Sequence, residues 1–112
     1  MTIEIELPAA ITAYFARLND ADKRAAINVF SPDAVVTDDG HTYRGHEGIL
    51  RWLGSAASEY SFTSTRLSTR ITGASVTVTT RLEGNFPGGI IDLRNIFTLD
   101  AAGLITILLI TV

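Results

Sequence analysis

Apolar residues in the first half of the chain recur at the spacing of amphipathic helices. One such stripe covers residues 7–18, and Pro8 suits the first turn of this helix. A shorter second helix is expected to end at Phe30, because Pro32 follows it. A third is predicted over about residues 47–57. All three predicted helices therefore lie in the first half of the chain.

The remaining pattern is that of β-strands joined by turns. A strand over residues 34–37 and a short returning strand over 41–44 flank Asp38-Asp39-Gly40, which is a turn signal. From Tyr60 onward every segment is predicted to be β, with long strands over 62–71, 76–82, 90–99 and 104–112. Helices followed by long antiparallel strands predict an α+β fold with the helices on one face of a curved sheet. Such a cone has an apolar interior that suits a ligand.

Composition narrows the class of protein. The 112 residues predict a single domain over 1–112, and the net charge is −3. The nine basic residues are scattered rather than gathered in a stripe, so we expect no nucleic-acid partner. The chain has no cysteine, and its N-terminus is acidic where a signal peptide would be basic. No apolar run is long enough for a membrane span, so a cytoplasmic protein with no membrane partner is expected.

Three segments resemble a known family. Residues 14–19 (YFARLN), 30–36 (FSPDAVV) and 43–45 (YRG) resemble the opening of SnoaL-like proteins, and 94–100 (RNIFTLD) resembles their penultimate hairpin. These proteins belong to the nuclear transport factor 2-like superfamily, together with the ketosteroid isomerases. The resemblance covers essentially the whole chain. It implies a cystatin-like α+β barrel, in which three N-terminal helices pack on the concave face of a cone-shaped antiparallel sheet.

The resemblance to ketosteroid isomerases also implies site residues. Tyr14 falls where their oxyanion-hole tyrosine lies, and Asp38 falls on their general-base aspartate. Asn95 falls where they use a protonated aspartic acid as the second oxyanion donor. An amide can also donate a hydrogen bond to an oxyanion. The loop over residues 38–44 is shorter than theirs.

Each of these residues also has a structural interpretation. Tyr14 could be a core aromatic, and Asp38 an ordinary turn aspartate. Asn95 shares a strand face with Phe97, so an inward amide would need a partner, which could be a ligand, Tyr14 or Asp38. The residues expected to form the ligand-binding wall are Phe15, Leu18, Trp52, Phe62 and Phe97.

Other chemistry has little support in the sequence. His41 with Asp38 and Asp39 could suggest a metal site, but Asp-Asp-Gly-His is typical of a turn, so no metal is predicted. No serine lies in a nucleophile-elbow context, and no phosphate loop or dinucleotide fingerprint is present, so no cofactor is expected.

Three functions stay open at this point. The first is a cofactor-independent isomerase, cyclase or related lyase that acts on a small hydrophobic carbonyl compound. In this enzyme Asp38 would abstract a proton, and Tyr14 and Asn95 would stabilise the oxyanion. The second is a non-catalytic domain that binds such a molecule, and the third is a structural homodimer. Dimerisation is expected in any case, because the last strand is apolar on both faces and Ile96 with Leu108 or its neighbour would lie outside.

Overall fold

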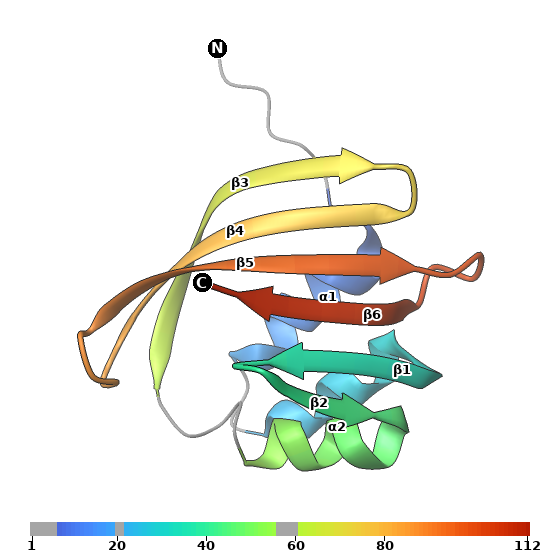
Figure 1. Ribbon diagram of the computed structural model, residues 1–112, viewed down its shortest axis with the longest axis horizontal. Helices are drawn as coiled ribbons and strands as arrows, with labels where there is room; N and C mark the ends of the chain where they lie inside the picture. The colour runs from blue at the N-terminus through green and yellow to red at the C-terminus, as the bar shows by residue number, and fades with distance from the viewer. Residues whose placement is uncertain (1–6, 20–21, 56–60) are drawn as a thin grey trace.

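The computed structural model describes residues 7–19, 22–55 and 61–112. The helical elements are α1 (Ala9–Leu18), the 3-10 helix η1 (Lys23–Val29) and α2 (Gly45–Gly54). The strands are β1 (Phe30–Asp38), β2 (His41–Arg44), β3 (Phe62–Thr72), β4 (Ser75–Gly84), β5 (Ile90–Leu99) and β6 (Ile105–Thr111) (Figure 1). Among the described residues no helix is long and apolar enough to cross a bilayer.

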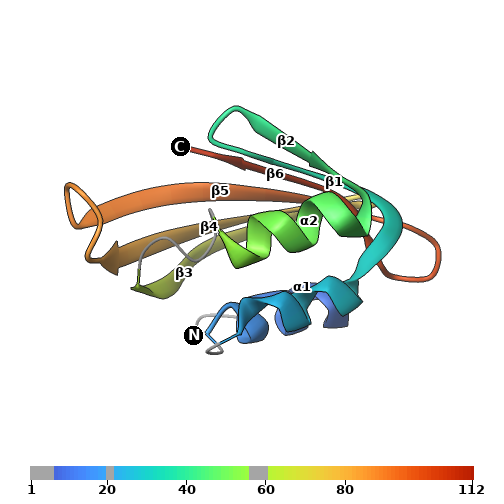
Figure 2. The same cartoon turned by 90° about the horizontal axis from the view of Figure 1, so that it is seen from below.

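The six strands form one curved sheet in the order β2-β1-β6-β5-β4-β3. Neighbouring strands are antiparallel except β1 and β6, which are parallel because the chain crosses from one side of the sheet to the other between them. Both α-helices lie on the concave side, and the sheet does not close (Figure 2). The α+β prediction is confirmed. The expectation of a wholly antiparallel sheet is wrong at this one pair.

The helix-to-strand junction near Pro32 differs from the prediction. Residues 23–29 form a 3-10 helix capped by the Asp22 carboxylate, and Phe30 already belongs to β1. The register of β1 against β6 shifts between Phe30 and Val35, and Pro32 lies within this irregular stretch. Because proline has no N–H to donate, it is tolerated at such an irregularity, and the strand can start earlier than the sequence indicates. The third helix spans residues 45–54, and the predicted end at Ala57 lies outside the described residues.

The core lies between the helices and the inner part of the sheet. Ile49, Trp52 and Leu53 of α2 follow helical spacing and are buried, as are Ile11 and Tyr14 of α1. They pack on a row of cross-strand neighbours that share the concave face, namely Val36, Leu108, Phe97 and Val76. This row fills the narrow end of the cone with side chains.

Candidate functional site

A cavity of about 1100 Å³ lies on the concave side of the sheet, beyond the filled row. Its floor follows from the strand register, because residues directly opposite on neighbouring strands point to the same face. The row next to the core consists of Asp38, Ile110, Asn95 and Val78. The following rows are Leu93, Thr80 and Arg66, and then Ile91, Leu82 and Ser64. All of these residues line the cavity, so its wall is mainly apolar with a few polar groups.

The inner end of the cavity is closed by aromatic rings. Tyr14 makes edge-to-face contacts with Phe15, Phe30 and Phe97, with ring centroids 5.2, 5.9 and 5.5 Å apart. Phe97 is fully buried in the row below the cavity floor and is not among the described lining residues. The rings of Tyr14 and Phe15 lie against Phe97, and its contact with a ligand stays a prediction.

Asp38 lies at the end of β1, where the chain turns through Asp39 and Gly40 into β2. Both turn residues have positive φ, of 51° and 75°, as a tight hairpin turn requires. The Asp38 carboxylate lines the cavity, and its Oδ2 atom accepts a hydrogen bond from Nε1 of Trp52 at 3.0 Å. Trp52 thus contributes more than an apolar wall, because its indole N–H fixes the direction of the carboxylate. Asp38 forms no hydrogen bond through Oδ1 within the part of the chain that the structure describes.

Tyr14 is 1 % exposed, and the structure confirms its place at the cavity. Its hydroxyl forms no hydrogen bond to any described residue. Tyr14 is nevertheless one of the residues that line the cavity. Burial, and to a smaller extent the nearby Asp38 carboxylate, raises the pKa of Tyr14 well above its ordinary value. Tyr14 therefore stays a hydrogen-bond donor at any physiological pH.

The raised pKa of Tyr14 predicts a loss of stability in alkali. Above about pH 10 the phenol ionises in the unfolded chain but not in the folded one, so its contribution is full below that pH and falls as pH rises. We expect one of the three tyrosines to give no tyrosinate absorbance until the protein unfolds. Replacing Tyr14 with phenylalanine should remove this silent tyrosine and flatten the alkaline slope of the unfolding free energy. An unchanged slope and titration would contradict the burial of this hydroxyl.

Asn95 faces the concave side as predicted and is 4 % exposed. Its amide nitrogen donates to the Val78 carbonyl at 3.0 Å and to Oγ1 of Thr80 at 3.1 Å. An amide nitrogen carries two hydrogens, so both donors are already used. The prediction that Asn95 donates to an oxyanion therefore needs correction, because the side chain is held against β4.

The other predicted wall residues are found where expected. Phe15, Leu18, Trp52 and Phe62 all line the cavity. The Lys23 ammonium lies 5.4 Å from the centre of the Phe62 ring, a cation–π contact between η1 and β3.

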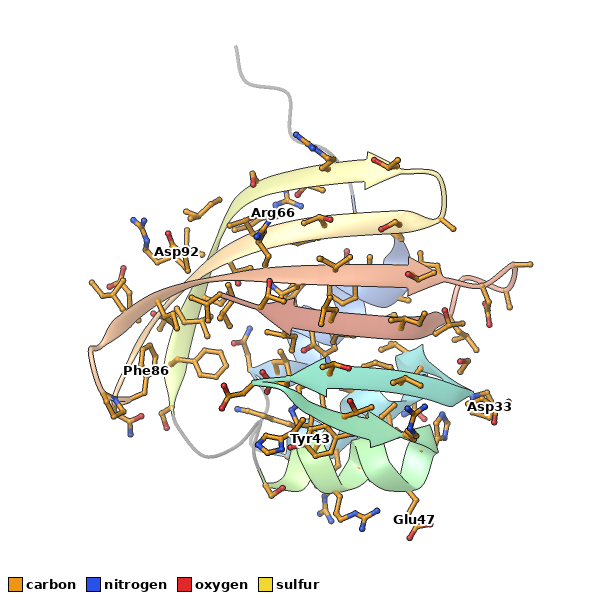
Figure 3. All side chains as sticks on the ribbon, in the orientation of Figure 1. Asp33, Tyr43, Glu47, Arg66, Phe86 and Asp92 are labelled. Carbon is orange, nitrogen blue, oxygen red and sulfur yellow. The ribbon has the colours of Figure 1, made fainter. Side chains whose placement is uncertain are left out.

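Phe86, which the sequence indicates as a core or pocket-wall aromatic, lines the cavity. Sequence reasoning missed Arg66 and Thr80, which also line it. Figure 3 shows Arg66 and Phe86 at the bent end of the sheet, away from Asp33 at the start of β1. The alternation of Phe62, Ser64 and Arg66 along β3 could have indicated Arg66, since every second residue shares a face.

Neither histidine contributes to a metal site in the described chain, where no three metal-ligating side chains gather. His46 instead bonds through Nε2 to the carbonyl of Phe30 at 2.9 Å, which ties the start of α2 to β1.

Comparison with known proteins assigns the family. A sequence profile described as the SnoaL-like domain matches residues 11–107, which is most of the chain. The chain belongs to this family. A proposed polyketide cyclase from Sinorhizobium meliloti is similar to this SnoaL-like domain, at 33% identity over 94% of this chain and 95% of the other, with a TM-score of 0.85. No curated protein matches it at a significant level.

Two more distant structures share the fold of this SnoaL-like domain. A Δ5-3-ketosteroid isomerase from Mycobacterium sp. is 20% identical over 93% of this chain and 90% of the other, with a TM-score of 0.76. The Mycobacterium tuberculosis protein RV0760c, solved in complex with estradiol-17β-hemisuccinate, is 18% identical over 96% and 95%, with a TM-score of 0.78. The fold therefore occurs in an isomerase and in a protein that holds a steroid.

Proposed function

We propose that this SnoaL-like domain is a cofactor-independent isomerase or cyclase that acts on a small hydrophobic carbonyl compound. The observation that carries the proposal is one cavity lined both by a carboxylate fixed by Trp52 and by Tyr14, whose hydroxyl bonds to no described residue. Asp38 is the general base, and Tyr14 is the oxyanion donor. Asn95 has no role in oxyanion stabilisation in this proposal.

The isomerase step balances without a co-reactant. Oδ1 of Asp38 removes a proton from a carbon next to the substrate carbonyl, and the electron pair moves onto the carbonyl oxygen. The resulting enolate oxygen accepts a hydrogen bond from the Tyr14 phenol, which stabilises the developing charge away from bulk water. The protonated Asp38 then returns the proton to a different carbon, so the double bond moves and the base is regenerated.

An isomerisation assay on a panel of hydrophobic unsaturated ketones tests the proposal, with binding of each ketone measured in parallel. Turnover of at least one member supports the enzyme. Binding of several members with no turnover would support the second function, a domain in which the same polar groups only orient a ligand.

We also propose that the convex face of the sheet pairs two copies of the chain. Four apolar side chains lie together there in adjacent rows, namely Val35, Ile107, Leu109 and Ile96. Leu108 is fully buried, whereas its neighbour Ile107 is 49% exposed. Of the two alternatives in the prediction, Leu108 or its neighbour, the neighbour is therefore the one that points outward. A symmetric sheet-to-sheet contact would cover this patch.

The dimer is expected to depend on Ile107. Replacing Ile107 with lysine would place a charge at the centre of the interface and should give a monomer in sedimentation at micromolar concentration. Ile71, which is 47% exposed on the edge strand β3, lies on the other face of the sheet and provides the matched control. The same replacement there should leave a dimer. A wild-type monomer at this concentration would refute the interface.

A cytoplasmic location, like the absence of nucleic-acid and membrane partners, stays a prediction.

A further inference from the structure

One charged side chain in the cavity wall has no part in the proposed reaction. Arg66 lies on β3, the strand at one edge of the sheet (Figure 3). Its neighbours on the concave face are Thr80 on β4 and Leu93 on β5. Arg66 is half-buried and lines the cavity, whose wall is mainly apolar. A partly buried cation in such a wall is costly unless an anion or hydrogen-bond acceptors face it.

The backbone of β3 is irregular directly after Arg66. Arg66 pairs with Thr80, but the next pair joins Ser68 to Thr79, so Leu67 is an extra residue on this strand. Such a bulge bends the strand and redirects the side chains beside it. It also reverses the alternation, so that Ser68 turns to the convex face instead of into the cavity. Among the described residues of β3, Arg66 is therefore the last to line the cavity.

Opposite charges occupy different walls of the cavity. Among its described lining residues the carboxylates are those of Asp38 and Asp39, and Arg66 is the one cation. Asp38 lies on β1 and Arg66 on β3, which are four strand spacings apart in the sheet. At about 5 Å per spacing this is about 20 Å along the curved sheet. The cation is therefore separated from the carboxylate that we assign as the base.

Arg66 also lies farther out than the ring of Tyr14. Tyr14 packs on Phe97, which shares its row with Val76, whereas Arg66 lies two strands and two rows away. At about 5 Å per strand and about 7 Å per row, the Cα atoms of Arg66 and Phe97 are about 17 Å apart along the sheet. Tyr14 thus closes the inner end of the cavity, and Arg66 belongs to its outer wall.

We infer that Arg66 binds a carboxylate group of the ligand, so that the substrate is a hydrophobic carbonyl compound that also carries a carboxylate at its outer end. A guanidinium presents five N–H donors in a planar fork that matches the two oxygens of a carboxylate. A phosphate dianion suits this cavity less well, because its second charge would add to those of Asp38 and Asp39. The inference rests on the proposed function, since it adds a second recognised group to the same ligand.

Two fluorescent probes test the carboxylate subsite by titration at neutral pH. Pyrenebutyrate and pyrenebutanol share an apolar ring system and a four-carbon chain, which ends in a carboxylate or in a neutral hydroxyl. Pyrenebutyrate is expected to bind on the order of tenfold more tightly, as for hydrogen bonds between charged groups. Equal affinities would overturn the subsite and leave the hydrophobic cavity intact. Failure of both probes to bind would instead overturn the hydrophobic ligand site of the proposed function, and the subsite with it.

Two arginine variants attribute the preference to Arg66. Arg66→Met keeps an unbranched side chain and removes the charge, so the preference for pyrenebutyrate should be lost. Arg70→Met removes the same charge from the exposed, convex face of the same strand and should leave the preference intact. A preference that survives Arg66→Met, or that falls equally in both variants, would refute the assignment. Equal weakening of both probes by Arg66→Met would also refute it, because Arg66 would then support the wall rather than hold the carboxylate.

The guanidinium itself gives a direct readout in the wild-type protein. In ¹H–¹⁵N spectra the Nε–H signal of Arg66, assigned by its absence from Arg66→Lys, should shift when pyrenebutyrate is added. Pyrenebutanol should shift it far less, because a hydroxyl forms a weaker hydrogen bond than a carboxylate. Bound pyrenebutyrate that leaves this signal in place would show that its carboxylate lies elsewhere and would overturn the inference.

Discussion

Replacing Asp38 with asparagine is expected to lower turnover on a responsive unsaturated ketone by about 10²–10⁴-fold, the usual contribution of a general base. Asparagine has nearly the same shape, and its Oδ1 can still accept the hydrogen bond from Trp52. Its amide cannot take up the substrate proton. Binding of the ketone should therefore change by only a few-fold, since the apolar wall is untouched.

The matched control is Asp33→Asn on the same strand. Asp33 is exposed at the start of β1 and is not among the described cavity-lining residues (Figure 3). The Asp33→Asn substitution removes the same charge from the protein without changing the site, so turnover should stay within about twofold. Turnover that survives Asp38→Asn would exclude the carboxylate as the base. An equal loss in both variants would point to net charge rather than to proton transfer.

The fold could be predicted well because its main signals are local. The alternation of apolar residues over 90–99 gives β5 with its observed bounds, and Asp39-Gly40 gives the hairpin turn. The errors occur where tertiary pairing overrides local preference. Pro32 reads as a breaker, but the irregular pairing of β1 with β6 accommodates it, and this parallel partner is more than seventy residues away along the chain.

The sequence predicts which residues of the site face the concave side of the sheet. It does not predict which hydrogen bonds their side chains form. Strand alternation places Asn95 inside, yet which of its atoms faces the cavity depends on Val78 and Thr80 of a neighbouring strand. The register between β4 and β5 decides this, and no single segment encodes it. The same holds for Phe97, which shares the concave face with Asn95 but lies one row deeper, beneath Tyr14. Two residues along a strand separate a cavity-lining residue from a core residue.

The link between Trp52 and Asp38 could not be read from the sequence either. The sequence predicts that Trp52 is a buried aromatic residue of an amphipathic helix, and its side chain is only 2% exposed. Its partner lies fourteen residues earlier on a different element. The hydrogen bond gives this residue two functions, one in the core and one at the site, and they can be separated by substitution.

Replacing Trp52 with alanine should lower the free energy of unfolding by about 3–5 kcal/mol, as for a large side chain removed from a packed core. The indole is buried, and its ring lies 6.2 Å from that of Tyr43, so its removal leaves a void that the helix and sheet cannot fill without moving. Denaturant unfolding monitored by circular dichroism measures the change. A loss below about 1 kcal/mol would mean that the ring does not fill the core as described.

Trp52→Phe separates the two functions, because phenylalanine keeps an aromatic ring in the core and has no N–H for Asp38. The expected loss of stability is smaller, about 1–3 kcal/mol, whereas turnover should fall because the carboxylate loses the bond that directs it. A positioning residue should lower kcat more than it raises KM, since the ketone still meets the same wall. If Trp52→Phe changes stability alone, the hydrogen bond serves the fold. If kcat falls in the variant that stays folded, Trp52 holds the base in place.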